Sequence, residues 1–393
     1  MMPQNNITNL VFQGGSVKGI AYIGALEILE NEIDLSQIKR VAGTSAGAIT
    51  AALLAFGFSV AEVKTLLSEF DFKALLDDKA FGIPTQGKIL KTVEKSESGV
   101  SSFFAKIPAK AVKLPLMSRL SKQLGVYEGE YFRLWAEKLI QEQVQKITKG
   151  KYTGEYLTFG ELHKLTQEYP GQFRDLFVIG SNFSLQKKEV FSYENPHTEN
   201  AIISDAIRIS MSIPYLFKPH HMYCKIDNER LVDTKRHLWV DGGVYDNYPI
   251  RCFDNTKYLE NTPVSKSFYN PETLGFRLVE KEHKNYFEGL NDKPENQVNR
   301  ISAFIKTMLN TNFHIQEEIY SQEEHKERTV YIDHLGISMF AFNLSKEQQE
   351  GLIQSGKKAT ETYFKGQSNL LVPTINPTTD ESIPEEENSL FRL

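Results

Sequence analysis

The sequence predicts an α/β protein built around a central, mostly parallel sheet. Two units near the start of the chain carry this prediction, because each combines a short apolar strand, a glycine-containing turn and an apolar helix. The first unit covers residues 8–13 and 19–30, and the second covers residues 38–44 and 46–56. Both helices are apolar nearly all round, which is typical of helices buried against a sheet.

The remaining elements follow from capping signals and strand patterns. A long amphipathic helix is expected from about Glu128 to Ile147. Three further helix starts are marked by capping boxes, which are Ser59 with Glu62, Thr158 with Glu161 and Ser345 with Gln348. Further strands are expected within residues 174–183, 188–193, 238–243 and 329–334.

Two segments differ from the rest of the chain. Residues 98–127 contain no Asp or Glu, and their basic side chains alternate with large apolar ones. This segment is either a solvated insertion loop or a lid that rests on an anionic lipid surface. Residues 366–393 are acidic and poor in apolar side chains, so we expect this tail to be disordered.

The overall composition argues against several classes of protein. A formal net charge of -5 gives no overall basic face for nucleic acid. The two cysteines are too few for a disulfide framework and lack the spacing of a metal cluster, so a reducing compartment is expected. No apolar run reaches the roughly 18 residues of a transmembrane helix, and the first residues lack the pattern of a signal peptide. We expect a cytoplasmic protein or one peripheral at membranes, and signal-less export stays open.

The turn of the second unit presents a candidate nucleophile. Ser45 stands at the centre of Gly-Thr-Ser-Ala-Gly, between a predicted strand and a predicted helix. On such a turn the serine projects from the sheet, and the helix directs its amino end toward the reaction centre. Gly43 and Gly47 are expected to be needed because neighbouring backbone approaches too closely for side chains. This context favours a nucleophile over a plain glycine-rich turn.

The turn of the first unit, "QGGSVKG", supplies candidate donors for the oxyanion that forms after attack. A Gly-Gly turn exposes consecutive backbone N–H groups at a helix start, which is an anion-binding arrangement. The alternative ligand is a nucleotide phosphate. A dinucleotide fingerprint would need glycine at Ser16, so the sequence favours the first interpretation.

Several motifs together resemble the patatin-like phospholipase family. They are "LVFQGGSVKGIAYIGALEILE", "GTSAG" and "WVDGGVYDNYPI", in the family's order and at similar spacing. The segments "AIRISMSIPYLFKP" and "LSKEQQEGLIQSGKKAT" are also similar to family segments. The resemblance implies a three-layer α/β/α fold with a central, mostly parallel sheet, and one domain over residues 7–365.

The resemblance further implies a Ser-Asp dyad that acts on lipid esters without a metal or organic cofactor. Ser45 would be the nucleophile, and Asp241 would accept its proton directly. The oxyanion hole would be formed by the backbone N–H groups around Gly14, Gly15 and Ser16. The implied motif positions are Lys18 and Gly19 in the first loop, Gly43 and Gly47 beside the nucleophile, and Gly242 and Gly243 after the aspartate.

Ser16, Asp241 and Arg208 each have a physical property that bears on this implied site. The commonest family form has glycine where this chain has Ser16, and serine adopts a positive φ less readily. A carboxylate with an ordinary pKa near 4 is a poor base for a hydroxyl, so we expect burial to raise the pKa of Asp241. Arg208 is expected either to contact a lipid headgroup or to form a structural ion pair.

Alternative functions stay open. The first is a catalytically silent lipid-binding or regulatory protein that keeps the fold, and the second is an esterase for small soluble esters. An ordinary α/β-hydrolase triad would need a histidine such as His334, although a role in capping a strand is favoured there. The expected partner is lipid at a membrane surface, and an activating partner is left open.

Overall fold

The structure is a computed structural model that describes residues 6–76, 124–261, 269–280 and 323–366, together with Met308, 311–312 and 315–316. Residues 98–123 of the basic, apolar segment lie outside the described residues, as does the predicted disordered tail from residue 367.

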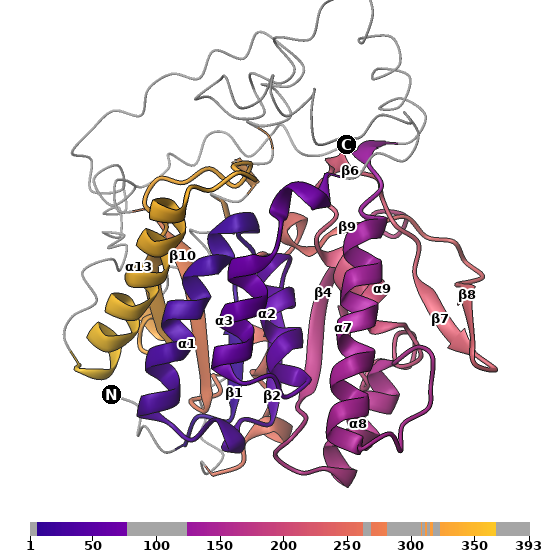
Figure 1. Ribbon diagram of the computed structural model, residues 1–393, viewed down its shortest axis with the longest axis horizontal. Coiled ribbons are helices and arrows are strands. Elements are labelled where there is room, and N and C mark those ends of the chain that lie inside the picture. The colour runs from indigo at the N-terminus through magenta and orange to yellow at the C-terminus, as the bar shows by residue number, and fades with distance from the viewer. Residues whose placement is uncertain are drawn as a thin grey trace, which may run out of the picture.

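A central sheet has the strand order β11-β10-β1-β2-β4-β5, and β9 also pairs with β4 (Figure 1). Strands β11, β10, β1, β2 and β4 are mutually parallel, whereas β5 and β9 run antiparallel to β4. The predicted mostly parallel α/β sheet is therefore confirmed. The strands are β1 (Asn9–Phe12), β2 (Arg40–Gly43), β4 (Asp175–Asn182), β5 (Lys187–Phe191), β9 (Trp239–Asp241), β10 (Thr273–Val279) and β11 (Thr329–Asp333).

Helices connect these strands. All three predicted capping boxes are present, at the starts of α3, α8 and α13. None of the described helices combines the length and apolar character needed to cross a membrane. The helices are α1 (Ala21–Glu32), α2 (Ala46–Ala55), α3 (Val60–Glu69), α7 (Glu130–Thr148), α8 (Phe159–Glu168), α9 (Ile203–Ser210), α12 (Glu323–Lys326) and α13 (Lys346–Phe364).

Short elements complete the described chain. The short 3₁₀ helices are η2 (Ser16–Ile20), η3 (Leu35–Gln37), η4 (Phe72–Leu75), η6 (Gly242–Val244), η7 (Ile250–Phe253) and η8 (Thr256–Tyr258). Strand β3 (Gly125–Tyr127) pairs in parallel with β6 (Tyr215–Phe217), and β7 (Tyr223–Ile226) forms a hairpin with β8 (Glu229–Val232). The last three residues of the basic, apolar segment are thus part of a small sheet.

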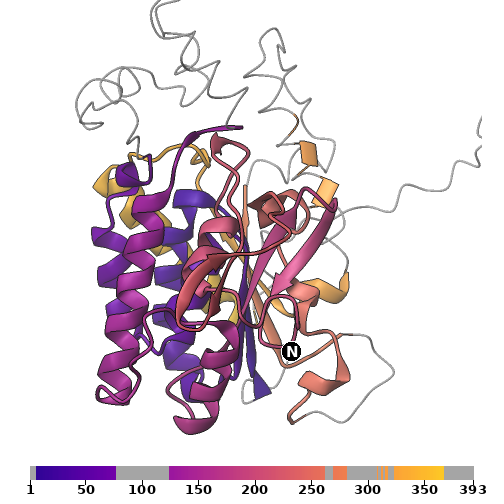
Figure 2. The same cartoon turned by 90° about the vertical axis from the view of Figure 1, so that its right-hand side faces the viewer.

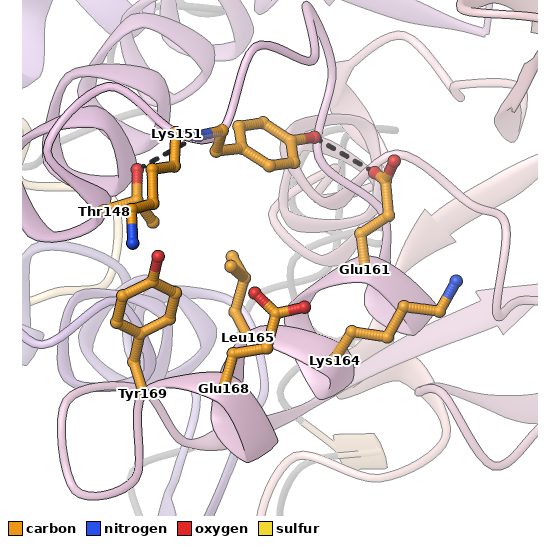
Figure 3. Close-up of a pocket in the computed structure, with 8 residues that line it drawn as sticks. Thr148, Lys151, Glu161, Lys164, Leu165, Glu168 and Tyr169 are labelled. Carbon is orange, nitrogen blue, oxygen red and sulfur yellow. Dashed lines mark hydrogen bonds between the residues drawn. The ribbon is translucent and has the colours of Figure 1, made fainter.

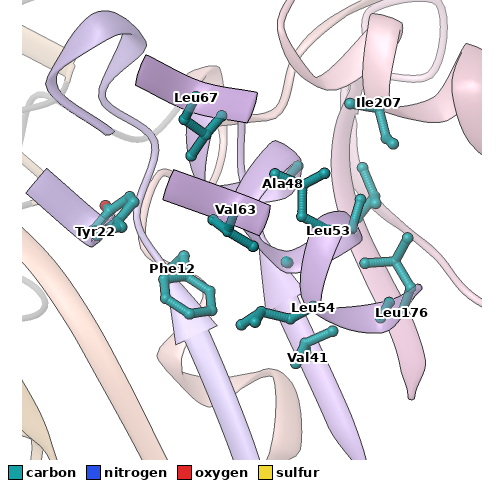
Figure 4. Close-up of a cluster of buried hydrophobic side chains, with 14 of the residues drawn as sticks. Phe12, Tyr22, Val41, Ala48, Leu53, Leu54, Val63, Leu67, Leu176 and Ile207 are labelled. Carbon is teal, nitrogen blue, oxygen red and sulfur yellow. The ribbon is translucent and has the colours of Figure 1, made fainter. Parts of the chain in front are cut away.

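The two faces of the sheet are covered differently, as Figure 2 shows. Phe12 and Val41 point toward α1, α2 and α3, where they join the larger apolar cluster (Figure 4). Their neighbours Val11 and Ala42 point to the other face and pack with side chains from η7 and η8. Successive strand residues alternate between faces, so a strand that is apolar throughout must be buried on both sides. This explains the continuous apolar runs of β1 and β2.

Strands β2 and β9 approach each other end to end along β4. Val178 of β4 pairs with Gly43 of β2 on one edge and with β5 on the other. Gly180, two residues further along β4, pairs with Asp241 of β9 and again with β5. Because β5 occupies the same edge of β4 in both cases, β2 and β9 must share the opposite edge. Their carboxyl ends therefore face each other, separated along β4 by two residues or about 7 Å.

Helix α13 packs tightly against α1, far from it in sequence. A Cβ atom on Gly24 of α1 would lie 1.8 Å from the carbonyl oxygen of Ile353, and one on Gly356 of α13 would lie 2.0 Å from that of Ala21. Two helices approach this closely only where neither carries a side chain at the contact. This contact joins an early and a late segment of the chain, and the domain bounds 7–365 stay a prediction.

Gly24→Ala should therefore destabilise the fold, although alanine favours helices more than glycine does. We expect the free energy of unfolding to fall by about 1–3 kcal/mol because the backbones must separate. Gly160→Ala in α8 is the matched control, since its added Cβ atom would meet its nearest neighbour at 3.4 Å. Chemical denaturation should show Gly160→Ala to be neutral or stabilising. Equal effects of the two variants would contradict this account of the contact.

Candidate active site

Ser45 occupies a strained turn between β2 and α2. Its backbone has φ 52° and ψ −123°, a conformation that residues other than glycine rarely adopt. The N–H of Ser45 donates to Oγ of Ser210 at 2.9 Å, which holds the turn from α9. Although Ser45 precedes α2, its side chain makes no capping hydrogen bond. The hydroxyl is therefore not used to cap the helix.

The flanking glycines are required by close backbone contacts, as the sequence predicts. A Cβ atom on Gly43 would lie 2.3 Å from the carbonyl group of Gly47. One on Gly47 would lie 2.3 Å from the carbonyl oxygen of Phe12, at the end of β1. Such distances leave no room for a side chain, so these glycines let β1, β2 and the start of α2 converge at Ser45.

Asp241 ends β9 with its carboxylate buried. Oδ1 accepts a hydrogen bond from the N–H of Gly243 at 2.7 Å, whereas Oδ2 has no hydrogen-bond partner among the described residues. Burial raises the pKa of Asp241 to about 7, against the opposing effects of Gly243 and of the nearby Ser45 hydroxyl. The predicted rise in this pKa is thus borne out. Gly242 is fixed by a close contact, because a Cβ atom there would lie 2.2 Å from the carbonyl oxygen of Ile179.

The structure brings Ser45 and Asp241 together at the facing ends of β2 and β9. The two side chains are only 6% and 5% exposed, respectively. The Ser45 hydroxyl lies near enough to the carboxylate to lower its pKa, yet Oδ2 makes no hydrogen bond of good geometry in this arrangement. Catalytic hydrogen bonds are often long before substrate binds.

The glycine-rich loop after β1 lies beside Ser45. A Cβ atom on Gly14 would lie 3.3 Å from that of Ser45, and one on Gly19 would lie 3.0 Å from that of Ala46. Ser16 has φ 53°, so the position where the family commonly has glycine does adopt the backbone conformation that glycine favours. Lys18 is half-buried within η2 of the same loop.

The three expected donors of the oxyanion hole differ in their hydrogen bonds. The N–H of Gly14 donates to the carbonyl oxygen of Asn247 at 2.9 Å, and Nδ2 of Asn247 donates to the carbonyl oxygen of Gly14 at 3.2 Å. Within the described part of the chain, the N–H groups of Gly15 and Ser16 have no acceptor. The N–H of Gly14 is therefore already used in a hydrogen bond to Asn247, whereas those of Gly15 and Ser16 are candidate donors to an oxyanion.

Arg208 is buried, which speaks against the first of its two expected roles, contact with a lipid headgroup. Its side chain is buried, and its guanidinium donates to the backbone carbonyl groups of Glu128 and Lys218 and to Oγ of Ser212. The guanidinium also lies over the ring of Phe217. Arg208 therefore joins α9 to the segments around β3 and β6, and it is not exposed to a lipid headgroup.

The histidines considered from the sequence lie away from this chemistry or have other partners. His334 follows β11, which is three strands from β2 in the sheet and thus about 14 Å away. Asp333 accepts a hydrogen bond from Leu335 at the end of the same strand, as expected for a capping role. His220 lies 2.7 Å from the buried carboxylate of Asp205, which Arg230 also contacts.

A separate open pocket of about 450 Å³ lies between the end of α7 and α8 (Figure 3). Its lining residues come from positions 148–169, just before the start of β4. Tyr152 and Glu161 hydrogen-bond to each other there. Ser45 lies at the carboxyl ends of the parallel strands, whereas this pocket lies near their amino ends, on the opposite side of the molecule from Ser45.

Three residues of the site were missed in the sequence, namely Ser210, Asn247 and Gln316. Ser210 and Asn247 lie within motifs that resemble the family, but only the contacts with Ser45 and Gly14 reveal what they do. Gln316 has no motif around it, and its N–H and carbonyl contacts appear only in the folded chain.

Comparison with known proteins identifies the family of this chain. The family model "Patatin-like phospholipase" matches residues 10–254, which is more than half of the chain. The chain belongs to the patatin-like phospholipase family. The matched region includes both turns at the start of the chain and the strand that ends at Asp241. The protein is accordingly a homologue of lipid hydrolases.

Individual relatives of this patatin-like protein are distant. The Bacillus subtilis protein YqhO is 26% identical over 361 residues, which cover 90% of this chain and 97% of YqhO. A probable lipid hydrolase of invertebrate iridescent virus 6, 463L, is 23% identical over 242 residues, which cover 61% of each chain. The crystal structure of VipD from Legionella pneumophila is similar with a TM-score of 0.50 and 17% identity, over 92% of this chain and 67% of VipD. This last likeness concerns the fold alone.

The raised pKa of Asp241 predicts how stability depends on pH. Between about pH 4 and 7 the folded protein keeps a proton on Asp241 that the unfolded chain has lost, so this residue lowers stability as pH rises. Asp241→Asn removes that cost, which reaches at most about 4 kcal/mol above pH 7. We expect the melting temperature of Asp241→Asn to rise relative to the unmutated protein between pH 5 and pH 8.

Asp205→Asn is the control of opposite sign. Burial alone would raise the pKa of Asp205, but hydrogen bonds from Arg230 and His220 outweigh burial and lower it. This carboxylate therefore stabilises the fold above its unfolded pKa, and the stabilisation is lost as pH falls through the folded pKa. Asp205→Asn should be destabilising at pH 8. A melting-temperature difference for Asp241→Asn that does not change with pH would contradict the assigned pKa.

Proposed function

We propose that the protein is a lipid acyl hydrolase that cleaves carboxylic ester bonds of phospholipids or related glycerolipids. Ser45 is the nucleophile, Asp241 is the base, and the reaction passes through an acyl-enzyme. The observation that carries the proposal is the end-to-end approach of β2 and β9 along β4. Membership of the patatin-like phospholipase family supports a lipid ester as the substrate class.

In the first half of the reaction, Oγ of Ser45 attacks the ester carbonyl carbon. Its proton passes to Oδ2 of Asp241, the carboxylate oxygen that has no hydrogen-bond partner among the described residues. The tetrahedral intermediate then collapses, and Asp241 returns the proton to the departing alcohol. The second half repeats these steps with water as the nucleophile, which releases the fatty acid and restores Ser45.

The negative charge on the intermediate needs donors on the side of the carbonyl oxygen. The N–H groups of Gly15 and Ser16 are suited to this role, because they have no acceptor within the described residues and lie in the loop beside Ser45. The amino end of α2 adds partial positive charge at the same place. Removal of one such donor in other acyl-transfer enzymes costs on the order of 3 kcal/mol.

The direct test is release of fatty acid from phospholipid vesicles by the full chain. Ser45→Ala and Asp241→Asn should each lower kcat by about 10³-fold or more, because each removes one member of a unit that acts together. Asp175→Asn is the matched control. Asp175 is also a buried carboxylate, but it begins β4, at the amino ends of the parallel strands, and its carboxylate pairs with His163. Full activity in either of the first two variants would refute the proposal.

The pH dependence of kcat/KM tests the role of Asp241 separately. A base must be ionised, and burial raises the pKa of Asp241 to about 7. We therefore expect kcat/KM to rise about tenfold per pH unit below pH 7 and to level off above it. A limb near pH 4 would show that the group controlling the reaction is an ordinary exposed carboxylate.

A further inference from the structure

The side-chain amide of Gln316 bridges the loop that follows Asp241. Nε2 donates to the carbonyl oxygen of Gly243 at 2.9 Å, and Oε1 accepts from the N–H of Asn247 at 2.7 Å. Nε2 also donates to Oδ1 of Asn312 at 2.7 Å and lies 3.3 Å from the carbonyl oxygen of Val244. With only 8% of its surface exposed, Gln316 offers this loop the donor and acceptor that a neighbouring strand would supply.

Each end of the bridged loop contacts a different part of the site. At one end, the N–H of Gly243 donates to Oδ1 of Asp241 at 2.7 Å and so fixes the orientation of the carboxylate. At the other end, Asn247 exchanges two hydrogen bonds with Gly14, through its carbonyl oxygen at 2.9 Å and its Nδ2 at 3.2 Å. Gly14 precedes the two candidate oxyanion donors, so one amide connects the base to the loop that would bind the oxyanion.

We propose that Gln316 is a positioning residue that holds Asp241 and the Gly14–Ser16 loop in register with Ser45. The inference rests on the proposed function, because it assigns a role within that site. Gln316 lies outside residues 10–254, the region that the family model matches. The C-terminal part of the chain therefore contributes to the chemistry as well as to the sheet.

The geometry requires glutamine in particular. Asparagine is shorter by one methylene and could not reach both Gly243 and Asn247 from the same backbone position. Glutamate could still accept from Asn247 but has no hydrogen to donate to Gly243, and it would add a negative charge near Asp241. Methionine keeps the length and much of the shape but neither hydrogen bond.

The experiment compares Gln316→Met, Gln316→Glu and Gln143→Met in the full chain, with phospholipid vesicles as substrate. Gln143 is the matched control, since it is also a buried glutamine, and its Nε2 donates to the carbonyl oxygen of Gly57 at 3.3 Å, far from Ser45. We expect Gln316→Met to lower kcat about 10- to 100-fold with KM within about twofold, because misplacement of reacting groups affects the chemical step. Gln143→Met should leave kcat within about twofold.

The pH profile separates positioning from a general loss of folded protein. In Gln316→Glu, the added charge should move the acid limb of kcat/KM upward by about half a unit or more, because a like charge disfavours ionisation of Asp241. A reduced amount of folded protein would lower the whole profile without moving its limb. Wild-type kcat in Gln316→Met, or an unmoved limb in Gln316→Glu, would overturn the inference.

Ser45→Ala, assayed beside these variants, distinguishes the two proposals. If Ser45→Ala is inactive and Gln316→Met retains wild-type kcat, only the role of Gln316 fails. If Ser45→Ala retains full activity, the proposed dyad fails and the role of Gln316 falls with it.

Discussion

Two strands that run in opposite directions share one edge of β4, and their carboxyl ends meet there. Gly43 pairs with Val178 and Asp241 pairs with Gly180, so the separation of the two ends is set by hydrogen bonds of the sheet. A one-residue change in the register of β9 would turn the Asp241 side chain to the other face. The position of the carboxylate therefore depends on the backbone hydrogen bonds between β9 and β4.

Burial at this meeting point has two opposed effects. It raises the pKa of Asp241 to about 7, which brings the carboxylate closer to what a base for a hydroxyl requires. The same burial destabilises the folded protein whenever Asp241 is ionised. The surrounding contacts oppose that cost, since Gly243 donates to the carboxylate and Gln316 holds Gly243. Ser45, in its strained backbone conformation, is held in a comparable way by Ser210.

Much of the fold follows from local sequence signals. The apolar runs of β1 and β2 and the capping boxes at Ser59, Thr158 and Ser345 predict elements that the structure contains. Strand β10 was not predicted, because Gly275 and the buried Arg277 interrupt its apolar pattern. Strand β10 is instead held by backbone pairing with β1, a contact between distant segments that a local sequence pattern does not indicate.

In the candidate site, too, some features follow from neighbouring residues in the sequence and others only from contacts in the folded chain. The need for Gly43 and Gly47 could be argued from the turn itself, whereas the burial of Arg208 depends on Glu128 and Lys218, which reach it only in the folded chain. Gln316 and Asn247 both hydrogen-bond to backbone groups of other residues. No motif surrounds Gln316, and the motif that contains Asn247 does not reveal its contact with Gly14.

The most direct measurement is a crystal structure of the protein after reaction with a fluorophosphonate, whose phosphoryl oxygen imitates the oxyanion. The account predicts phosphorus bonded to Oγ of Ser45, that oxygen within about 3.1 Å of the N–H groups of Gly15 and Ser16, and the Asp241 carboxylate beside Oγ. Phosphorus on another residue, or Asp241 turned away from Ser45 across the sheet, would contradict it.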